Sequence, residues 1–452
     1  MFFHNIIPLG DNCEISIALK ELGVRSKAYP FDWISHKCSE PKYSVLEQNI
    51  RLFLELIETN NVDVVVEKLV GNIDENNKFN CDYIFPFEVG SKQEVKDKYT
   101  RRVKRLYSDV INKNNVNLFI MITRCCPTDI DLILRLYIKI LQLNPINKLV
   151  FVSETQQDIS NFNLPNLTFK YLVNNEEQVR KSLLKDFLTE ELKSKNILFI
   201  TAFKDINRKE WKLYNRTNQE YYECFFKLCQ FIEFNLVVYL EKNICEELKA
   251  SYIFTPNIIF KEFDEVNTFL KKYLEEDKRV MSSLIYKNKI PLDRKNHPEH
   301  LYSEYNLINH SKINFVRDAK ETYPYYDFYS WIDFGYVKDQ ISIPYKANIN
   351  PNKLPEKIIY QCLKYPDLNR KINPNSMLTS YDIYLTGSSF IVHKELVEIL
   401  EQIWNDKIKE WHINYISDDD QNLVIQLYYD HPELFYLIQY HEWFSLFYLL
   451  PK

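Results

Sequence analysis

The sequence predicts an α/β protein made of two domains. Short apolar runs, typical of buried strands, alternate with amphipathic segments long enough to be helices, and this alternation occurs in two series. The chain has 452 residues, enough for two or three domains of ordinary size. A charged helical segment over 183–196 separates the two series. We therefore expect one domain over 1–192 and a second over 193–452.

A βαβ pattern in the first domain predicts parallel strands. "NLFIMIT" (117–123) and "KLVFVSE" (148–154) are the expected strands, joined by a helix that Thr128 or Asp129 caps. "LTFKYLV" (167–173) continues the sheet. Further helices are expected at "CEISIALKEL" (13–22), at 43–58 and at 93–112.

The second domain shows the same alternation of expected strands and helices. "ILFITAF" (197–203) and "NLVVYLE" (235–241) are expected strands flanking a helix of about fifteen residues. One later strand ends at Asp333 in "YSWIDFGYV", and another covers 383–392. Helical segments are expected near 264–276, 302–322, 394–411 and 419–429.

Composition excludes several functional classes. The 57 basic and 62 acidic residues are interleaved and leave a net charge of −5, so no nucleic-acid partner is indicated. Nine cysteines without paired spacing favour free thiols and a reducing compartment. No apolar run approaches the roughly 20 residues that span a bilayer, and the amino terminus lacks the features of a signal peptide. We expect a cytoplasmic protein with no transmembrane segment.

Asp333 and Gly335 stand out in an aromatic stretch. A buried carboxylate is costly unless it is paired, and ligands of open parallel sheets bind outside the carboxyl ends of the strands. The chain has only six glycines, so Gly335 is expected where the chain must turn away without a side chain. Asp333 could hold a divalent cation that neutralises a diphosphate. The alternative is a turn carboxylate that caps the next segment.

Five stretches carry a family resemblance. In order they are "ILFITAFKDINRKEW", "HPEHLYSEYNLINHSKINFVRDA", "YSWIDFGYV", "LTGSSFIV" and "SDDDQNLV". This order resembles the HtrL/YibB family of bacterial proteins, which look like glycosyltransferases of the GT-A type, over most of 197–445. The resemblance implies a GT-A-like (nucleotide-diphospho-sugar transferase) open sheet in the second domain. It also implies sugar transfer from a nucleotide-sugar donor to a saccharide or protein-linked glycan, with the first domain as an accessory.

The same resemblance assigns donor-binding residues. The end of the first strand would cradle the base and ribose, Asp205 would accept from the base or ribose, and Arg208 would pair with the diphosphate. A surface ion pair is the alternative for Asp205 and Arg208. Lys312 would reach the donor from its helix, and a small-residue turn would leave room for the donor sugar. The remaining residues assigned to the donor are Thr201, Ala202 and Phe203 on the strand, Asp333 and Gly335, and Gly387 and Ser388 in the turn.

The resemblance also bears on metal and catalysis. Asp333 would take the first place of a metal-binding D-x-D motif, but Gly335 occupies the second, so Mn²⁺ or Mg²⁺ would need another ligand. His441 matches the place where such enzymes return a histidine to the metal, although a packing role is the alternative. A carboxylate base must deprotonate the acceptor hydroxyl. Asp420 is the first candidate and Asp419 the second; if configuration is retained, this carboxylate would instead contact the donor sugar.

The opening "IPLGDNCEISIALKELGVRSKAYPFDWI" resembles a papain-like cysteine peptidase family, most strongly over 6–34. Cys13 at a helix N-terminus would have its thiolate favoured, with His4 or His36 as the base. The family carries a further histidine where this chain has Phe87, and the βαβ pattern fits a doubly wound sheet better than a papain-like barrel. A cysteine hydrolase using Cys13 and His36, or a non-catalytic carbohydrate- or protein-binding protein, are the alternatives to a transferase.

Overall fold

The computed structural model divides the chain into two compact units, Met1–Ser194 and Lys195–Lys452. The sequence placed this boundary between 192 and 193. The structure describes residues 3–9, 14–22, 24, 27–31, 45–70, 91–112, 115–123, 129–153, 164, 166–171, 182–189, 195–255, 257–263, 268–367, 378 and 383–451.

The first unit contains an all-parallel sheet in the order β1-β2-β3-β4. Alternate residues of the central strands face opposite cores, since Phe119 packs with one set of helices and Leu118 with another. Asp129 caps α5 by accepting from two backbone N–H groups. The elements are β1 (Asn5–Pro8), α1 (Glu14–Glu21), α2 (Val45–Thr59), α3 (Val62–Val70), α4 (Lys92–Ile111), β2 (Asn117–Thr123), α5 (Ile130–Leu143), β3 (Lys148–Ser153), β4 (Leu167–Tyr171) and a helix over 182–189.

The second unit is built on a seven-stranded open sheet in the order β11-β9-β10-β8-β5-β6-β7. All neighbouring pairs are parallel except those of β10, which runs antiparallel to both β8 and β9. The start of β10 therefore lies beside the carboxyl end of β8. The strands are β5 (Ile197–Phe203), β6 (Leu236–Leu240), β7 (Ile258–Glu262), β8 (Phe328–Ile332), β9 (Ile358–Cys362), β10 (Leu385–His393) and β11 (Phe435–Gln439).

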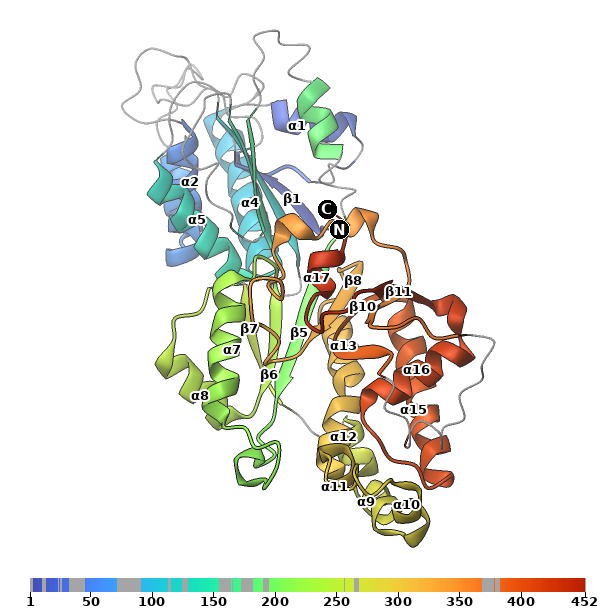
Figure 1. Cartoon of the computed structure of the whole chain (residues 1–452). Helices are drawn as coiled ribbons and strands as arrows, with labels where there is room; N and C mark the ends of the chain where they lie inside the picture. Colours follow the sequence, from blue (N-terminus) through green and yellow to red (C-terminus); the bar gives the residue numbers. More distant parts are fainter. Residues whose placement is uncertain are drawn as a thin grey trace. The chain divides into compact units, whose positions relative to one another are not determined.

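Helices cover both faces of this sheet (Figure 1). Phe225 of α7 packs in one core with Phe199 of β5. On the other face, Phe315 of α13 contacts Tyr239 and Trp331. The helices are α7 (Asn218–Phe231), α8 (Lys242–Ser251), α9 (Phe269–Ser282), α10 (Leu284–Lys289), α11 (Pro298–Leu301), α12 (Ser303–His310), α13 (Lys312–Thr322), α15 (Val397–Ile413), α16 (Asp420–Asp430) and α17 (Leu446–Leu449).

The fold class predicted from the sequence, two α/β domains with an open sheet in the second, is confirmed. The predicted helix near 264–276 is observed as α9, which begins later because Thr268 caps it. No helix in the described part of the chain is long and apolar enough to cross a membrane. The four cysteines among the described residues are free thiols.

Candidate functional site

A cavity of about 310 Å³ opens at the carboxyl ends of β5 and β8. We call it the first cavity. It brings together most of the predicted site residues, because β5, β8, the start of β10 and the N-terminus of α16 meet there. The predicted residues that line it are Ala202, Phe203, Asp205, Arg208, Lys312, Asp333, Gly335, Gly387, Ser388, Asp419 and Asp420.

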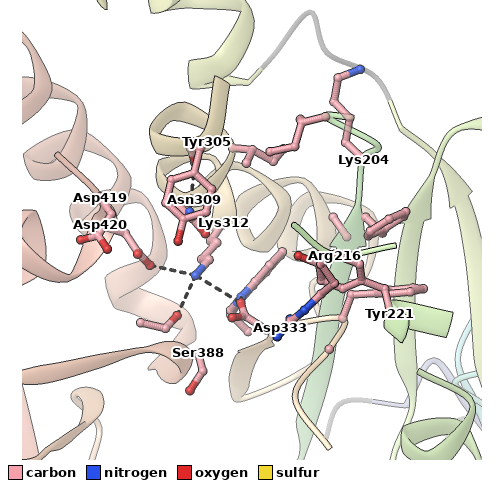
Figure 2. Close-up of a pocket in the computed structure, with 18 of the residues that line it drawn as sticks. Lys204, Arg216, Tyr221, Tyr305, Asn309, Lys312, Asp333, Ser388, Asp419 and Asp420 are labelled. Atoms are coloured by element: carbon pink, nitrogen blue, oxygen red, sulfur yellow. Dashed lines mark hydrogen bonds and ion pairs between the residues drawn. The ribbon is translucent and has the colours of Figure 1, made fainter. Parts of the chain in front are cut away.

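Lys312, the first residue of α13, lies at the centre of this arrangement (Figure 2). Its Nζ donates to the Gly387 carbonyl at 2.7 Å and to Asp420 Oδ2 at 2.9 Å, and lies 3.2 Å from Asp333 Oδ1. The side chain is 4% exposed. Burial opposes its charge, but Asp333 and Asp420 outweigh burial and hold the pKa of Lys312 above its ordinary value. Lys312 is therefore a buried cation between two carboxylates.

Asp333 follows β8 directly, as the sequence predicted. Its backbone N–H donates to the Ser388 carbonyl at 2.9 Å, which fixes it against β10. Oδ1 accepts from Trp331 Nε1 at 2.8 Å as well as facing Lys312. The side chain remains 37% exposed to the cavity, and no described residue donates to Oδ2. Oδ2 is therefore free to accept a hydrogen bond from a ligand.

Gly335 lies in a turn after β8, as predicted, but the explanation offered for Gly387 needs correction. Gly387 and Ser388 lie within β10, not in a turn. A Cβ added at Gly387 would lie 2.8 Å from Asp420 Oδ1, so the space is taken by a protein carboxylate, not reserved for a sugar. A Cβ at Gly335 would approach the ring of Tyr221 at 3.3 Å. Both glycines permit close packing of the walls around the cavity.

The acidic run at 418–420 begins α16. Asp419 is the N-cap residue, and its Oδ1 accepts from the Gln421 N–H at 3.1 Å. The loop before α16 is held by α12, because the His310 ring donates to the Asp418 carbonyl at 3.0 Å. Burial, followed by repulsion from Asp418 and Asp420, raises the pKa of Asp419 well above its ordinary value. Asp419 is thus a carboxylate with an unusually high proton affinity in the cavity wall.

The loop after β5 supplies the opposite side of the cavity. Asp205 Oδ1 accepts from the Asn207 N–H at 2.7 Å and Oδ2 from Asn218 Nδ2 at 2.9 Å, so both oxygens hold the loop. Arg208 donates to the Tyr221 hydroxyl at 2.7 Å and to the backbone carbonyl of residue 214 at 3.0 Å. The alternative prediction for Asp205 and Arg208 was a surface ion pair. Neither side chain forms an ion pair among the described residues.

Three cationic side chains of this cavity have no ion-pair partner within 4 Å among the described residues. They are Arg208, Arg216 and Lys338, and we call them the basic wall. The Arg216 guanidinium lies 5.0 Å from the centre of the Tyr221 ring (Figure 2). Lys338 Nζ lies 3.5 Å from the Cys224 sulfur. Lys204 also lines the cavity but pairs with Glu241 at 3.1 Å. The sequence analysis missed Arg216 and Lys338, since neither belongs to a recognisable spacing.

A second cavity of about 260 Å³ adjoins the first. Asp419, Gln421 and Trp443 line both cavities. The other side chains of the second cavity are polar or aromatic in the main: Arg294, His297, Glu299, Ile383, Tyr384, Asp418, Asn422 and Ile425. Asp419 therefore stands between two spaces that could each hold part of a ligand.

The described residues do not fit the predicted Mn²⁺ or Mg²⁺ site. They contain no group of three histidine, cysteine, aspartate or glutamate side chains that could hold a metal ion. His441 is exposed and does not line the cavity. One oxygen of the Asp333 carboxylate, Oδ1, already faces the Lys312 ammonium, which leaves a single oxygen for an ion.

Two other predictions concern Thr201 and the pair Cys13 and His36. Thr201 is buried in β5 and does not line the cavity, and its hydroxyl has no hydrogen-bond partner among the described residues. Cys13 and His36, the alternative nucleophile and base, lie outside the described residues.

Comparisons with protein families match both units. A model described as "Bacterial protein of unknown function (HtrL_YibB)" matches residues 195–451. A second model, described as "Putative papain-like cysteine peptidase (DUF1796)", matches residues 4–145. Both resemblances found in the sequence are confirmed. Protein HtrL of Escherichia coli (strain K12) is 20% identical over 263 residues, which cover 55% of this chain and 90% of that protein.

Two solved structures show weak similarity. One is a glycosyltransferase involved in the glycosylation of the major capsid of PBCV-1, at 10% identity and a TM-score of 0.28, covering 54% of this chain and 81% of the other. The second is a cytidylyltransferase from Leptospira borgpetersenii serovar Hardjo-bovis, at 10% identity and a TM-score of 0.26, covering 56% and 78%.

Proposed function

Because this chain belongs to the HtrL/YibB family of bacterial proteins, whose function is unknown, its activity has to be argued from its own site, and we propose that it is a glycosyltransferase. It would move a sugar from a nucleotide-sugar donor to a saccharide or protein-linked glycan acceptor. The observation that carries this proposal is the first cavity. There Asp333, a pair of carboxylates at the start of α16, Lys312 and the three cations of the basic wall meet at the carboxyl ends of parallel strands.

The donor nucleotide fits the side of the cavity formed by β5 and β8. Phe203 and Tyr221 offer apolar ring surface to a base, and their centroids lie 5.1 Å apart. The free Oδ2 of Asp333 can accept from a ribose hydroxyl, a bond to a charged acceptor that is stronger than one between neutral groups. The basic wall lies where it can receive the diphosphate.

The acceptor fits the second cavity, and Asp419 is the better candidate for the base. The sequence analysis put Asp420 first, but Asp420 Oδ2 is held by Lys312 and its carboxylate packs against Gly387. Asp419 lines both cavities, and its raised pKa suits a group that accepts a proton. Asp419 would take the proton of the acceptor hydroxyl while the oxygen of that hydroxyl bonds to the anomeric carbon of the donor sugar. The bond from that carbon to the diphosphate breaks, and the nucleoside diphosphate leaves.

A turnover screen tests the proposal. The full chain is incubated with a panel of UDP-, GDP- and dTDP-sugars, and release of the nucleoside diphosphate is measured with and without added oligosaccharides. We expect release from one class of donor. Asp333→Asn should lower kcat/KM by about ten- to a hundredfold, since it removes a hydrogen bond to a charged oxygen.

Asp406→Asn is the matched control, because Asp406 lies on the surface of α15 and its side chain is 54% exposed. It should behave as the wild type. If folded wild-type protein neither binds nor turns over any donor, the transferase proposal is wrong. If Asp333→Asn equals the wild type, the donor lies elsewhere.

A further inference from the structure

We propose that Lys312 occupies the place of a divalent cation in this site, and that the basic wall neutralises the donor diphosphate, so that donor binding requires no metal ion. The inference rests on the proposed function and names how the same site handles the charge of its donor. Three observations support it: the contacts of Lys312, the cations of the basic wall, which have no ion-pair partner within 4 Å among the described residues, and the charge around Asp333.

The Lys312 ammonium is surrounded as a bound cation would be. Three oxygens, from the Gly387 carbonyl, Asp420 and Asp333, lie 2.7, 2.9 and 3.2 Å from Nζ. An ammonium has three N–H donors, of which two bond to the Gly387 carbonyl and Asp420, while Asp333 lies at ion-pair distance. The three dashed lines in Figure 2 meet at this nitrogen. The oxygens that could have gathered around a metal are thereby held by a side chain.

Because its ammonium group is held by the Gly387 carbonyl, Asp420 and Asp333, Lys312 positions the two carboxylates and is not free to bind phosphate. The charge of the two donor phosphates must then be met by other groups. Arg208 Nε has no hydrogen-bond partner, and the Arg216 guanidinium lies against the Tyr221 ring without an ion-pair partner within 4 Å among the described residues. Guanidinium groups bind phosphate oxygens in pairs, so these arginines suit a diphosphate.

Glu220, an acidic neighbour of two of its residues, leaves the basic wall available. Glu220 interacts electrostatically with Arg216 and Lys338, and its pKa is lowered chiefly by hydrogen bonds from Thr217. Its Oε2 accepts from the Thr217 N–H at 2.7 Å and from the Thr217 hydroxyl at 2.9 Å. Glu220 is therefore committed to the start of α7 and does not line the cavity.

The surroundings of Asp333 oppose a divalent ion. An ion on its free oxygen would share one carboxylate with the Lys312 ammonium, while the basic wall contributes further positive charge to the same cavity. A hard cation of this kind prefers several oxygen ligands. Among the described residues on the nucleotide side of the cavity, only Asp333 presents a carboxylate oxygen that accepts no hydrogen bond. That oxygen is well suited to a ribose hydroxyl.

The decisive experiment is a calorimetric titration of the full-length wild type with UDP, GDP, dTDP and ADP, in EDTA and in excess Mn²⁺. We expect one nucleotide to bind with the same Kd in both conditions. Binding that appears only with Mn²⁺, or that strengthens by more than about tenfold, overturns the inference and leaves the transferase proposal standing. The absence of binding in both conditions contradicts both.

Variants separate the two parts of the inference. Arg216→Gln should weaken nucleoside diphosphate binding by about ten- to a hundredfold, reduce its salt dependence, and leave binding of the bare nucleoside unchanged. Arg279→Gln, on the exposed surface of α9, is the matched control. An Arg216→Gln protein that binds like the wild type contradicts the role of the basic wall.

Lys312→Ala addresses the central cation. The emptied space would be lined by three oxygens, so Mn²⁺ should raise the melting temperature of this variant and not that of the wild type. A folded Lys312→Ala protein whose melting temperature does not change with Mn²⁺ contradicts the claim that Lys312 occupies the place of a cation. The wild-type titration does not depend on this variant folding.

Discussion

At the scale of single residues, the three aspartates at the start of α16 have three different tasks. Asp418 shapes the loop, because its carboxylate accepts from the Asp419 N–H at 2.9 Å and from Asn422 Nδ2 at 2.7 Å. Asp420 holds Lys312. Asp419 alone of the three lines both cavities while having no cationic partner within ion-pair distance among the described residues. One acidic run thus supplies a structural group, a charge partner and the proposed base.

Asp419→Asn tests this division. A base that takes a proton in the transition state contributes about 10²- to 10⁴-fold to the rate, so kcat should fall by that order while the donor Kd stays unchanged. Only the ionised carboxylate can act. Because burial and its acidic neighbours raise the pKa of Asp419, wild-type kcat should increase as the pH rises through that raised pKa. Kinetics over a range of pH measure both effects, and an unchanged kcat in Asp419→Asn would exclude Asp419 as the base.

The residue-scale predictions from the sequence succeeded where a residue was chemically unusual for its surroundings. Asp333 was conspicuous as a carboxylate in an aromatic strand, and it lies in the cavity. Arg216 was not conspicuous, because basic residues are common on loops and only the fold brings it to the cavity. His310 was missed for the same reason, although its ring anchors the Asp418 loop.

At the scale of elements, the direction of β10 builds the site. Because β10 is antiparallel to β8, Gly387 near its start meets the carboxyl end of β8 and the N-terminus of α16. Sequence patterns found β10 but not its direction, since apolar periodicity is the same for both. Four strands, β1, β7, β9 and β11, were missed: each is only four or five residues long, and β7 and β11 are only partly buried, which weakens the apolar signal.

Gly387→Ala tests the close approach of β10 to α16. The added Cβ would lie 2.8 Å from one oxygen of Asp420 and 2.9 Å from the other, so the carboxylate must move away from Lys312. We expect a loss of about 1 to 3 kcal/mol in the free energy of unfolding, measured by urea denaturation. Gly335→Ala is the matched control, because its nearest neighbour is a Tyr221 ring carbon at 3.3 Å and the cost should be smaller. Equal stability of Gly387→Ala and the wild type would contradict the packing described.

At the scale of the whole molecule, the proposed chemistry lies within one unit. All residues that line both cavities belong to Lys195–Lys452. Each unit also has hydrophobic clusters of its own. The role of the first unit as an accessory stays a prediction. Domain number and strand rhythm are local properties of the sequence and could be predicted; the meeting of Lys312 with Asp420, 108 positions away, depends on the closed fold and could not.

The most direct test of the central claim is a crystal structure of the full chain with the nucleoside diphosphate that binds it. The account predicts density in the first cavity, with a ribose hydroxyl on Asp333 and the phosphates against Arg216, and with Lys312 still bound to Asp420. A nucleotide bound in the first unit, or outside the cavity at the carboxyl ends of β5 and β8, would contradict the account.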